Sequence, residues 1–172
     1  MMTLRCTQKL LRRIKVTPEI VTAPPSTTLG DWYANLLYLG RRQLVLCISE
    51  RSFLPIVLLA KDSASLPQRL VEGVVWMLPR MGVSAQVTRT ELDEMGTVHI
   101  DRTQSRRVLG VLNETAWALP FEVERYPTAS PEEYGLRLAD IRYGLINYQS
   151  PLEVTRTLLG VRHADMPAAH DR

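Results

Sequence analysis

The sequence predicts an α+β fold, in which an antiparallel meander sheet at about residues 32–60 and an additional N-terminal strand are packed by helices. Short polar connections, of the length that joins antiparallel neighbours, separate three β-prone runs at residues 32–39, 43–49 and 53–60. The middle run is apolar at every position from Leu44 to Ile48, which indicates a central strand covered on both faces. An amphipathic stretch that follows the third run predicts a helix to cover one face.

The N-terminal segment predicts a strand at residues 2–6 and then a helix that ends at about Ile14. Thr7 is placed to cap this helix, because threonine accepts hydrogen bonds from first-turn amides. Three cations lie near the C-terminal end of this helix: Arg12, Arg13 and Lys15. They complement the helix dipole, and we prefer this interpretation to a phosphate site. The proline-containing residues 17–30 are expected to form an extended surface loop.

Several elements are expected after the first two strands of the meander. Pro55 lacks a backbone donor, so it marks a bulge or an edge position in the third run. A helix is expected at residues 66–81, ending near Gly82, which is free to adopt a positive φ. Two further runs, at residues 83–91 and 96–102, are each expected to form a strand.

The last third of the chain predicts three helices. The first covers about residues 105–119, and Gly110 weakens it by roughly 1 kcal/mol relative to alanine unless something packs close against the backbone. The second begins at Pro131, and the third begins at Ser150, where Glu153 completes a possible capping box.

Composition bounds the class of protein. The 172 residues fit one domain, at 1–160, followed by a flexible tail at 161–172. The excess of 21 basic over 18 acidic residues is compatible with a polyanionic partner but falls short of a dedicated basic surface. Only 6% of the residues are aromatic, which argues against stacking of single-stranded nucleic acid on aromatic platforms.

Two features favour a cytoplasmic localisation with no membrane partner. Cys6 and Cys47 are flanked by aliphatic or β-forming residues, so they are expected to be small buried hydrophobes in a reducing compartment. Basic residues interrupt the first fourteen positions, unlike a secretory signal, and no window approaches the about 20 apolar residues that span a bilayer.

The sequence carries no phosphate-binding glycine loop, paired-cysteine motif, nucleophile elbow or His-Glu-x-x-His helix, so it predicts no cofactor and leaves enzymatic activity undecided. The densest polar group is residues 103–107, at an expected strand-to-helix junction. Exposed backbone donors and the Arg106 guanidinium could hold an anion there. The alternative is that Thr103 or Ser105 simply caps the helix while Arg106 pairs with a nearby acid.

A second unusual segment contains Asp31 and Asn35 on either side of two large aromatic residues. Asp31 is expected to reach an arginine of residues 103–107, either as an internal ion pair or as part of a shared ligand site. His99 and Asp101 would share one face of a strand, and Glu91 or Asp93 could join them at a metal. Two ligands are too few, so no metal site is predicted there or from the weaker tail candidates His163, Asp165, His170 and Asp171.

Three blocks of sequence, in order, resemble a small bacterial family of unknown function. They are LRCTQKLL at residues 4–11, LGDWYANLL at 29–37 and TQSRRVLGVLN at 103–113. Family members open with R-C-T-x-K-L-L and contain T-x-[NS]-R-S-V-L-G-x-[ML]-N. Later segments at residues 136–139 and 148–154 also resemble the family, so the resemblance covers nearly the whole chain.

The resemblance implies a stand-alone bacterial cytoplasmic domain and brings no established activity, cofactor or catalytic residue with it. The chain departs from the family pattern at Arg107, where the family has serine, and at Glu114, where aspartate is common. Any hypothesis of a site that depends on that serine hydroxyl is therefore weakened for this chain.

The preferred functional hypothesis is a binding or regulatory module that recognises a protein or a nucleic acid. Its expected ligand surface gathers Asp31, Asn35, Thr103, Arg106 and Asn113. One alternative is an enzyme for a phosphate-containing or other anionic substrate, in which Asp31, Arg106 and His99 converge in a concave pocket. Another alternative is a structural subunit of a homo-oligomer.

Overall fold

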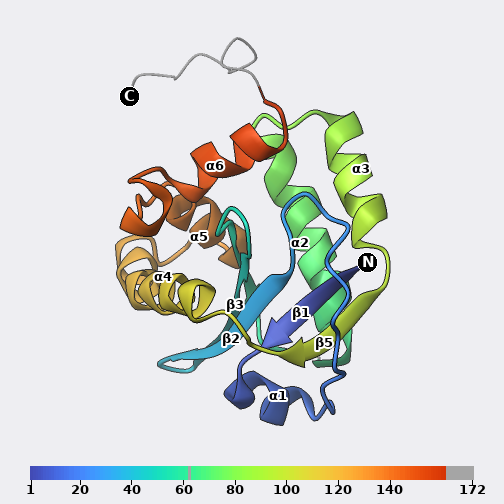
Figure 1. The fold of residues 1–172 in the computed structure, drawn as a ribbon. Helices are drawn as coiled ribbons and strands as arrows, with labels where there is room; N and C mark the ends of the chain where they lie inside the picture. Colours follow the sequence, from blue (N-terminus) through green and yellow to red (C-terminus); the bar gives the residue numbers. More distant parts are fainter. Residues whose placement is uncertain (62, 162–172) are drawn as a thin grey trace, which may run out of the picture.

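Five strands form one mixed sheet in the computed structural model, which describes residues 1–61 and 63–161 (Figure 1). Its order is β4-β3-β2-β1-β5. The strands are β1 (Met2–Cys6), β2 (Trp32–Leu39), β3 (Arg42–Ser49), β4 (Pro55–Leu59) and β5 (Val98–Arg102). The predicted meander is confirmed, because β3 pairs antiparallel with both β2 and β4.

The expectation of an antiparallel sheet is wrong for the other half of the molecule. Strand β1 pairs in parallel with β2 on one side and with β5 on the other. A parallel pair needs a crossover of a dozen or more residues, and residues 7–31 supply one between β1 and β2. The α+β class therefore holds, with a sheet that is antiparallel on one side and parallel on the other.

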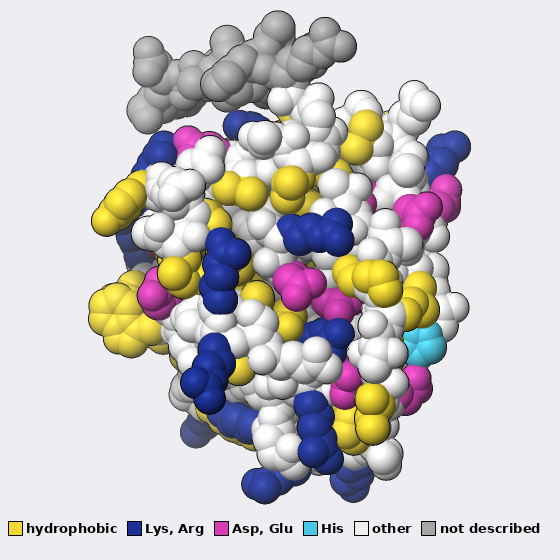
Figure 2. Space-filling model, in the orientation of Figure 1, with side chains coloured by type: hydrophobic (Ala, Val, Ile, Leu, Met, Phe, Trp, Pro, Cys, Tyr) yellow, Lys and Arg dark blue, Asp and Glu magenta, His cyan; other side chains and the backbone are white. Residues whose placement is uncertain are grey.

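Helices cover both faces of this sheet and one of its ends (Figure 1). They are α1 (Gln8–Ile14), α2 (Leu66–Arg80), α3 (Ala85–Met95), α4 (Arg106–Arg125), α5 (Pro131–Leu138) and α6 (Pro151–Leu158). Leu70 and Val74 of α2 belong to one core, whereas Val108 and Leu112 of α4 belong to a second core. The short helix α1 lies at the end of the sheet where β1 stops, and Lys and Arg side chains gather at that end of the molecule (Figure 2).

The central position of β3 is confirmed by how its side chains alternate. Leu44, Leu46 and Ile48 pack in the core under α4, and the intervening Val45 and Cys47 pack in the core under α2. Pro55 opens β4, which is an edge strand, so its missing donor removes no hydrogen bond from the middle of the sheet.

The strand expected at residues 83–91 is wrong, because this segment begins α3. Ser84 caps that helix by accepting a hydrogen bond from the Val87 amide at 3.3 Å. Thr88, Glu91 and Met95 are its buried residues, and they recur at helical spacing. The helix expected at 105–119 also continues beyond Pro120 to Arg125. The capping box expected at Ser150 is present, and Ser130 forms a second one that was not predicted.

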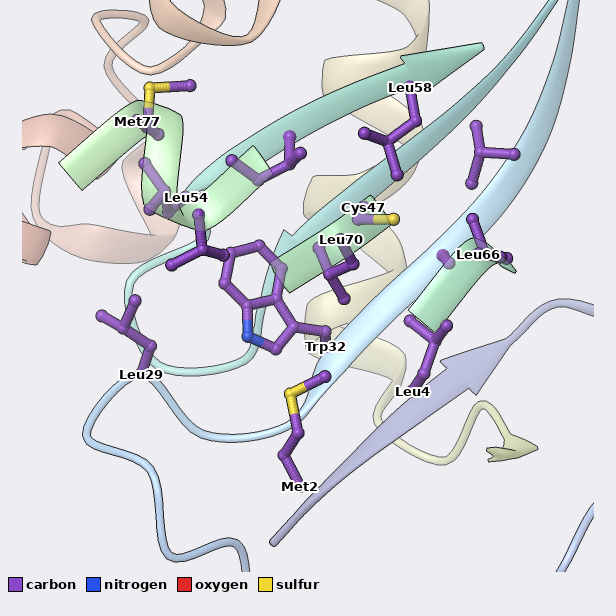
Figure 3. Packing of buried hydrophobic residues seen from close by; sticks show 14 of the residues in the cluster. Met2, Leu4, Leu29, Trp32, Cys47, Leu54, Leu58, Leu66, Leu70 and Met77 are labelled. Carbon is purple, nitrogen blue, oxygen red and sulfur yellow. The ribbon is translucent and has the colours of Figure 1, made fainter. Parts of the chain in front are cut away.

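Trp32 is the largest side chain of the core between the sheet and α2. It is fully buried, and Figure 3 shows its indole ring among Met2, Leu29, Leu54 and Leu70. Within the described part of the chain its Nε1 has no hydrogen-bond partner. The surrounding apolar packing therefore has to compensate for an unpaired donor.

Both cysteines are free and buried, as predicted from their neighbours. Burial raises the pKa of Cys6 to about 12 and raises the pKa of Cys47 as well. Because the thiolate is the reactive form, neither residue should react with iodoacetamide at pH 8 in the folded protein, and both should react in guanidinium chloride. Mass spectrometry of timed samples measures this, and labelling of the native protein as fast as a small thiol would contradict it.

Over residues 1–61 and 63–161, no helix combines the length and apolar character required to cross a bilayer. The expected tail lies outside the described residues apart from Val161, and so do its candidate metal ligands, His163, Asp165, His170 and Asp171.

Candidate functional site

The three parallel strands carry polar residues on a single face of the sheet. Arg5 of β1 lies opposite Tyr33 of β2 and Asp101 of β5, and Thr3 lies opposite His99. Alternate residues of a strand point to the same side, so the polar positions of neighbouring strands face the same way. Together with residues just outside the strand ends, they are Thr3, Arg5, Thr7, Asp31, Tyr33, Asn35, His99, Asp101 and Thr103.

Arg5 is the centre of this polar face and is only 6% exposed. Its Nε and Nη2 lie 2.9 and 2.8 Å from Oδ2 of Asp31, and its Nη1 lies 3.3 Å from Oδ2 of Asp101. Asp31 also accepts a hydrogen bond from the Thr3 amide at 2.8 Å. One buried guanidinium thus pairs with two carboxylates, and pairing is how a buried charge is stabilised.

Asp31 therefore forms an internal ion pair, but not with the arginine that we expected. The prediction placed its partner in residues 103–107, whereas the partner is Arg5 on the adjacent strand. The error follows from the parallel pairing of β1 and β2, which brings the two side chains to the same face. Asp31 is 2% exposed and has its partners within the protein, which favours a structural role.

His99 and Asp101 share a face, as predicted, but they have different partners. Nδ1 of His99 lies 2.7 Å from Oε2 of Glu19. Asp101 accepts hydrogen bonds from the backbone amides of Val21 and Arg102. Glu91, a candidate third metal ligand, instead accepts hydrogen bonds from the backbone amides of Thr28 and Leu29.

These partners bear on the metal site and on the enzyme alternative. The described ranges contain no group of three or more side chains placed to hold a metal ion. Asp31 and His99 are engaged by internal partners, and Arg106 is exposed. The enzyme alternative therefore gains no support from the placement of these three side chains.

Asn35 and Thr103 lie where the parallel pairing ends, Asn35 within β2 directly after Ala34, which pairs with Cys6, and Thr103 directly after β5. The Thr7 hydroxyl donates to Oδ1 of Asn35 at 2.8 Å, and the Thr7 amide donates to Ala34 at 3.0 Å. Thr103 follows Arg102, which pairs with Cys6 of β1. Thr103 therefore lies beside Thr7, and with Asn35 they form a row of polar residues across the sheet. Hydroxyl and amide groups from three chain segments thus meet at this end.

The start of α4 is attached to the same row. The Ser105 amide donates to the Tyr33 hydroxyl at 3.2 Å, and the Ser105 hydroxyl accepts from the Val108 amide at 3.3 Å. The capping role expected for Ser105 is therefore confirmed. Burial raises the pKa of Tyr33, so its hydroxyl stays protonated and available to this contact at neutral pH.

Cations surround this row and form what we call the basic end. Its members are Lys9, Arg12, Arg13, Arg41, Arg42, Lys61, Arg69 and Arg102. Figure 2 shows dark blue Lys and Arg side chains along this lower part of the molecule. Arg106 is exposed at the start of α4, at the margin of the same end.

Cations of α1 lie close to cations from other segments of the basic end. Nζ of Lys9 lies 4.4 Å from the ring centre of Tyr38, beside the β2–β3 turn that carries Arg41 and Arg42. Arg13 borders one hollow together with Lys61 and Arg69. Arg12 and Arg102 border another, of about 170 Å³, together with Gln8.

Asn113 does not join this group. It is exposed on α4 and lines a separate hollow with Trp117. Of the five predicted ligand residues, the structure therefore places Asn35, Thr103 and Arg106 at one end, Asp31 in the interior and Asn113 on another surface.

The sequence model of one protein family, described as a domain of unknown function (DUF6933), matches residues 3–154. The chain belongs to this family. The DUF6933 match begins in β1 and ends in α6, so it includes all five strands described above and every predicted ligand residue. The resemblance expected from the sequence is confirmed. A comparison with curated proteins finds no match.

Two parts of the site in this DUF6933 chain were not predicted: Arg5, and the contribution of α1 to a cluster of cations. Arg5 stands in a strand whose other residues are buried, and a charge in such a strand requires a partner. That requirement was the signal that could have found it. Arg12 and Arg13 do lie in the last turn of α1, but the expected dipole role left out the cations that other segments add around them.

Proposed function

We propose that the chain is a binding module that recognises double-stranded nucleic acid by contacting phosphates with its basic end. The observation that carries the proposal is that cations of α1 border two hollows together with cations from residues 61–69 and from the end of β5, while Lys9 of α1 lies against Tyr38 near the β2–β3 turn. The four ion pairs found within residues 1–61 and 63–161 involve none of them. Arg13, Arg42 and Arg69 donate to backbone carbonyls, which leaves their positive charge without an acidic partner among the described residues.

The chemistry of this end suits a phosphate backbone better than base recognition. Arginine forms paired hydrogen bonds with phosphate oxygens, and the Arg12 and Arg102 side chains border one hollow. The hydroxyls and amide of Thr7, Thr103 and Asn35 add neutral groups of the kind that position a protein on phosphates and sugars. Few aromatic side chains are present to stack unpaired bases, which favours a duplex.

Salt dependence tests this function. If four phosphates are contacted, affinity for a fluorescein-labelled 20-base-pair DNA should fall about 150-fold between 50 and 200 mM salt, because each contact releases condensed counterions. Fluorescence anisotropy measures both affinities. Arg12→Glu should weaken binding at 50 mM salt by at least about tenfold, because it removes one cation and adds a repulsive charge.

Arg89→Glu provides the matched control. Arg89 is exposed on α3, away from the basic end, so reversing its charge should change affinity by less than about threefold. Equal losses in both variants would show that only net charge matters and would contradict a site at the basic end. Absence of binding at 50 mM salt would reject the proposed function, and salt-independent capture of a protein would favour a protein ligand.

A further inference from the structure

One face of α4 carries large hydrophobic side chains that the rest of the molecule does not cover. Trp117 is 72% exposed and Phe121 is 54% exposed, and their ring centres lie 4.9 Å apart. Figure 2 shows hydrophobic side chains projecting at the edge of the molecule that α4 forms. Residues at spacings of three and four share this face, which we call the outer stripe: Arg106, Gly110, Asn113, Trp117, Phe121 and Glu124.

Gly110 is unexplained by contacts within the chain. A side-chain carbon added there would meet no described atom within 4 Å, whereas one added to Gly73 would lie 2.6 Å from Ile56. A glycine inside a helix costs about 1 kcal/mol relative to alanine. Within the described chain nothing packs close to Gly110 to offset this cost, which points to a surface that approaches from outside.

A hollow of about 500 Å³ lies beside the outer stripe. Asn113, Trp117 and Ala118 line it from α4, and Ile141 and Tyr143 line it from the segment after α5. The hollow is largely apolar and lies next to the projecting Trp117 ring. The same face thus offers both a protruding aromatic side chain and a recess that can receive one.

We propose that the outer stripe docks on a second copy of this chain, with the two α4 helices antiparallel about a two-fold axis near residue 115. In that arrangement Arg106 lies opposite Glu124 of the partner subunit, and the reciprocal pair forms at the other end. Neither side chain has an ion pair in the described structure. A two-fold interface joins one surface patch to its own copy, so every contact occurs twice, and the reciprocal Arg106–Glu124 pairs meet this condition.

The same register explains the remaining positions. Gly110 lies opposite Pro120 of the partner subunit, near the partner's Phe121, which allows the helices to approach to the about 8–10 Å of packed pairs. Asn113 lies opposite the partner's Trp117, so each indole reaches the other copy's hollow. Glycine, tryptophan and the two charges thereby acquire a common explanation.

The interface is small, which sets the expected affinity. Each aromatic side chain buries roughly 150–250 Å² when fully covered, so the four aromatic groups and their surroundings come to less than about 1,200 Å². Interfaces of this size are weak, so the dimer should dissociate in the micromolar range.

Sedimentation equilibrium from 5 to 500 µM protein, without nucleic acid, tests the proposal. The wild type should show a monomer–dimer equilibrium, and Trp117→Ala should raise the dissociation constant at least about tenfold, as expected for a central tryptophan. Ile20→Ser is the control, because Ile20 is 91% exposed but lies in the loop between α1 and β2. This substitution should leave the dissociation constant unchanged. Circular dichroism checks that each variant is folded.

Charge reversal tests the antiparallel register. Glu124→Arg should weaken the dimer by placing two arginines opposite each other, and adding Arg106→Glu should restore the wild-type constant. A wild type that stays monomeric to 500 µM, a dimer that Trp117→Ala leaves intact, or a double variant that fails to recover would each overturn the proposal. Because mass is the readout, these outcomes are independent of nucleic-acid binding.

Discussion

Replacing Arg5 with methionine is expected to lower the free energy of unfolding by about 3–5 kcal/mol, the cost of removing one partner from a buried ion pair. The guanidinium is the cation that pairs with both Asp31 and Asp101, whose side chains are only 3% and 7% exposed. Methionine fills a similar volume, so the effect reports the uncompensated carboxylates rather than a cavity.

Urea denaturation followed by circular dichroism measures this loss. Arg142→Met is the matched control, because Arg142 forms an ion pair with Glu153 in which the two side chains are 61% and 38% exposed. Exposed pairs contribute about 0–1 kcal/mol, so the control should change stability by no more than that. Equal effects of the two substitutions would contradict a special role for Arg5.

Replacing Trp32 with alanine should cost about 3–5 kcal/mol, because it empties a large volume in a fully buried site. Trp32→Phe should cost less, since it keeps most of the ring packing and removes the unpaired indole donor. Thermal or urea unfolding of the two variants gives the comparison.

Trp117→Ala is the control for Trp32. The exposed indole makes little contact within the chain, so at low micromolar concentration its loss should change stability by about 0.5 kcal/mol or less. A phenylalanine variant at position 32 as unstable as the alanine variant would show that the indole nitrogen has a favourable role.

Local patterns predicted the meander well. Because the turns between β2, β3 and β4 are short, these strands can pair only as antiparallel neighbours. The apolar run from Leu44 to Ile48 identified β3 as the strand with two covered faces. Capping residues located the starts of α1 and α6, because their hydrogen bonds involve only neighbours in sequence, and Pro131 located the start of α5.

Long-range pairing could not be predicted in the same way. Nothing near residues 2–6 or 98–102 indicates that β1 and β5 lie side by side, because the pairing depends on how α2 and α3 carry the chain across the sheet. A strand was expected at residues 83–91, whereas Thr88, Glu91 and Met95 are buried at helical spacing in α3. Because two of the buried positions of α3 are polar, the apolar residues alone do not recur at helical spacing.

The candidate site was predictable only in part, for the same reason. Asp31 was correctly expected to pair with an arginine, but choosing Arg5 required the parallel register. Asn35, Thr103 and Arg106 were selected by residue type, and the structure brings them to one end. The basic end as a whole was not foreseen, because its cations come from segments far apart in the sequence.

The position of β1 has a consequence for biosynthesis. β1 is translated before every other described strand, yet it lies inside the sheet and meets β5 only after Val98 and the residues that follow have been made. Until then one side of β1 keeps unpaired backbone groups, which attract other chains. A nascent chain stalled before Val98 should therefore need a chaperone, and refolding should be limited by this late closure rather than by the fast local hairpins.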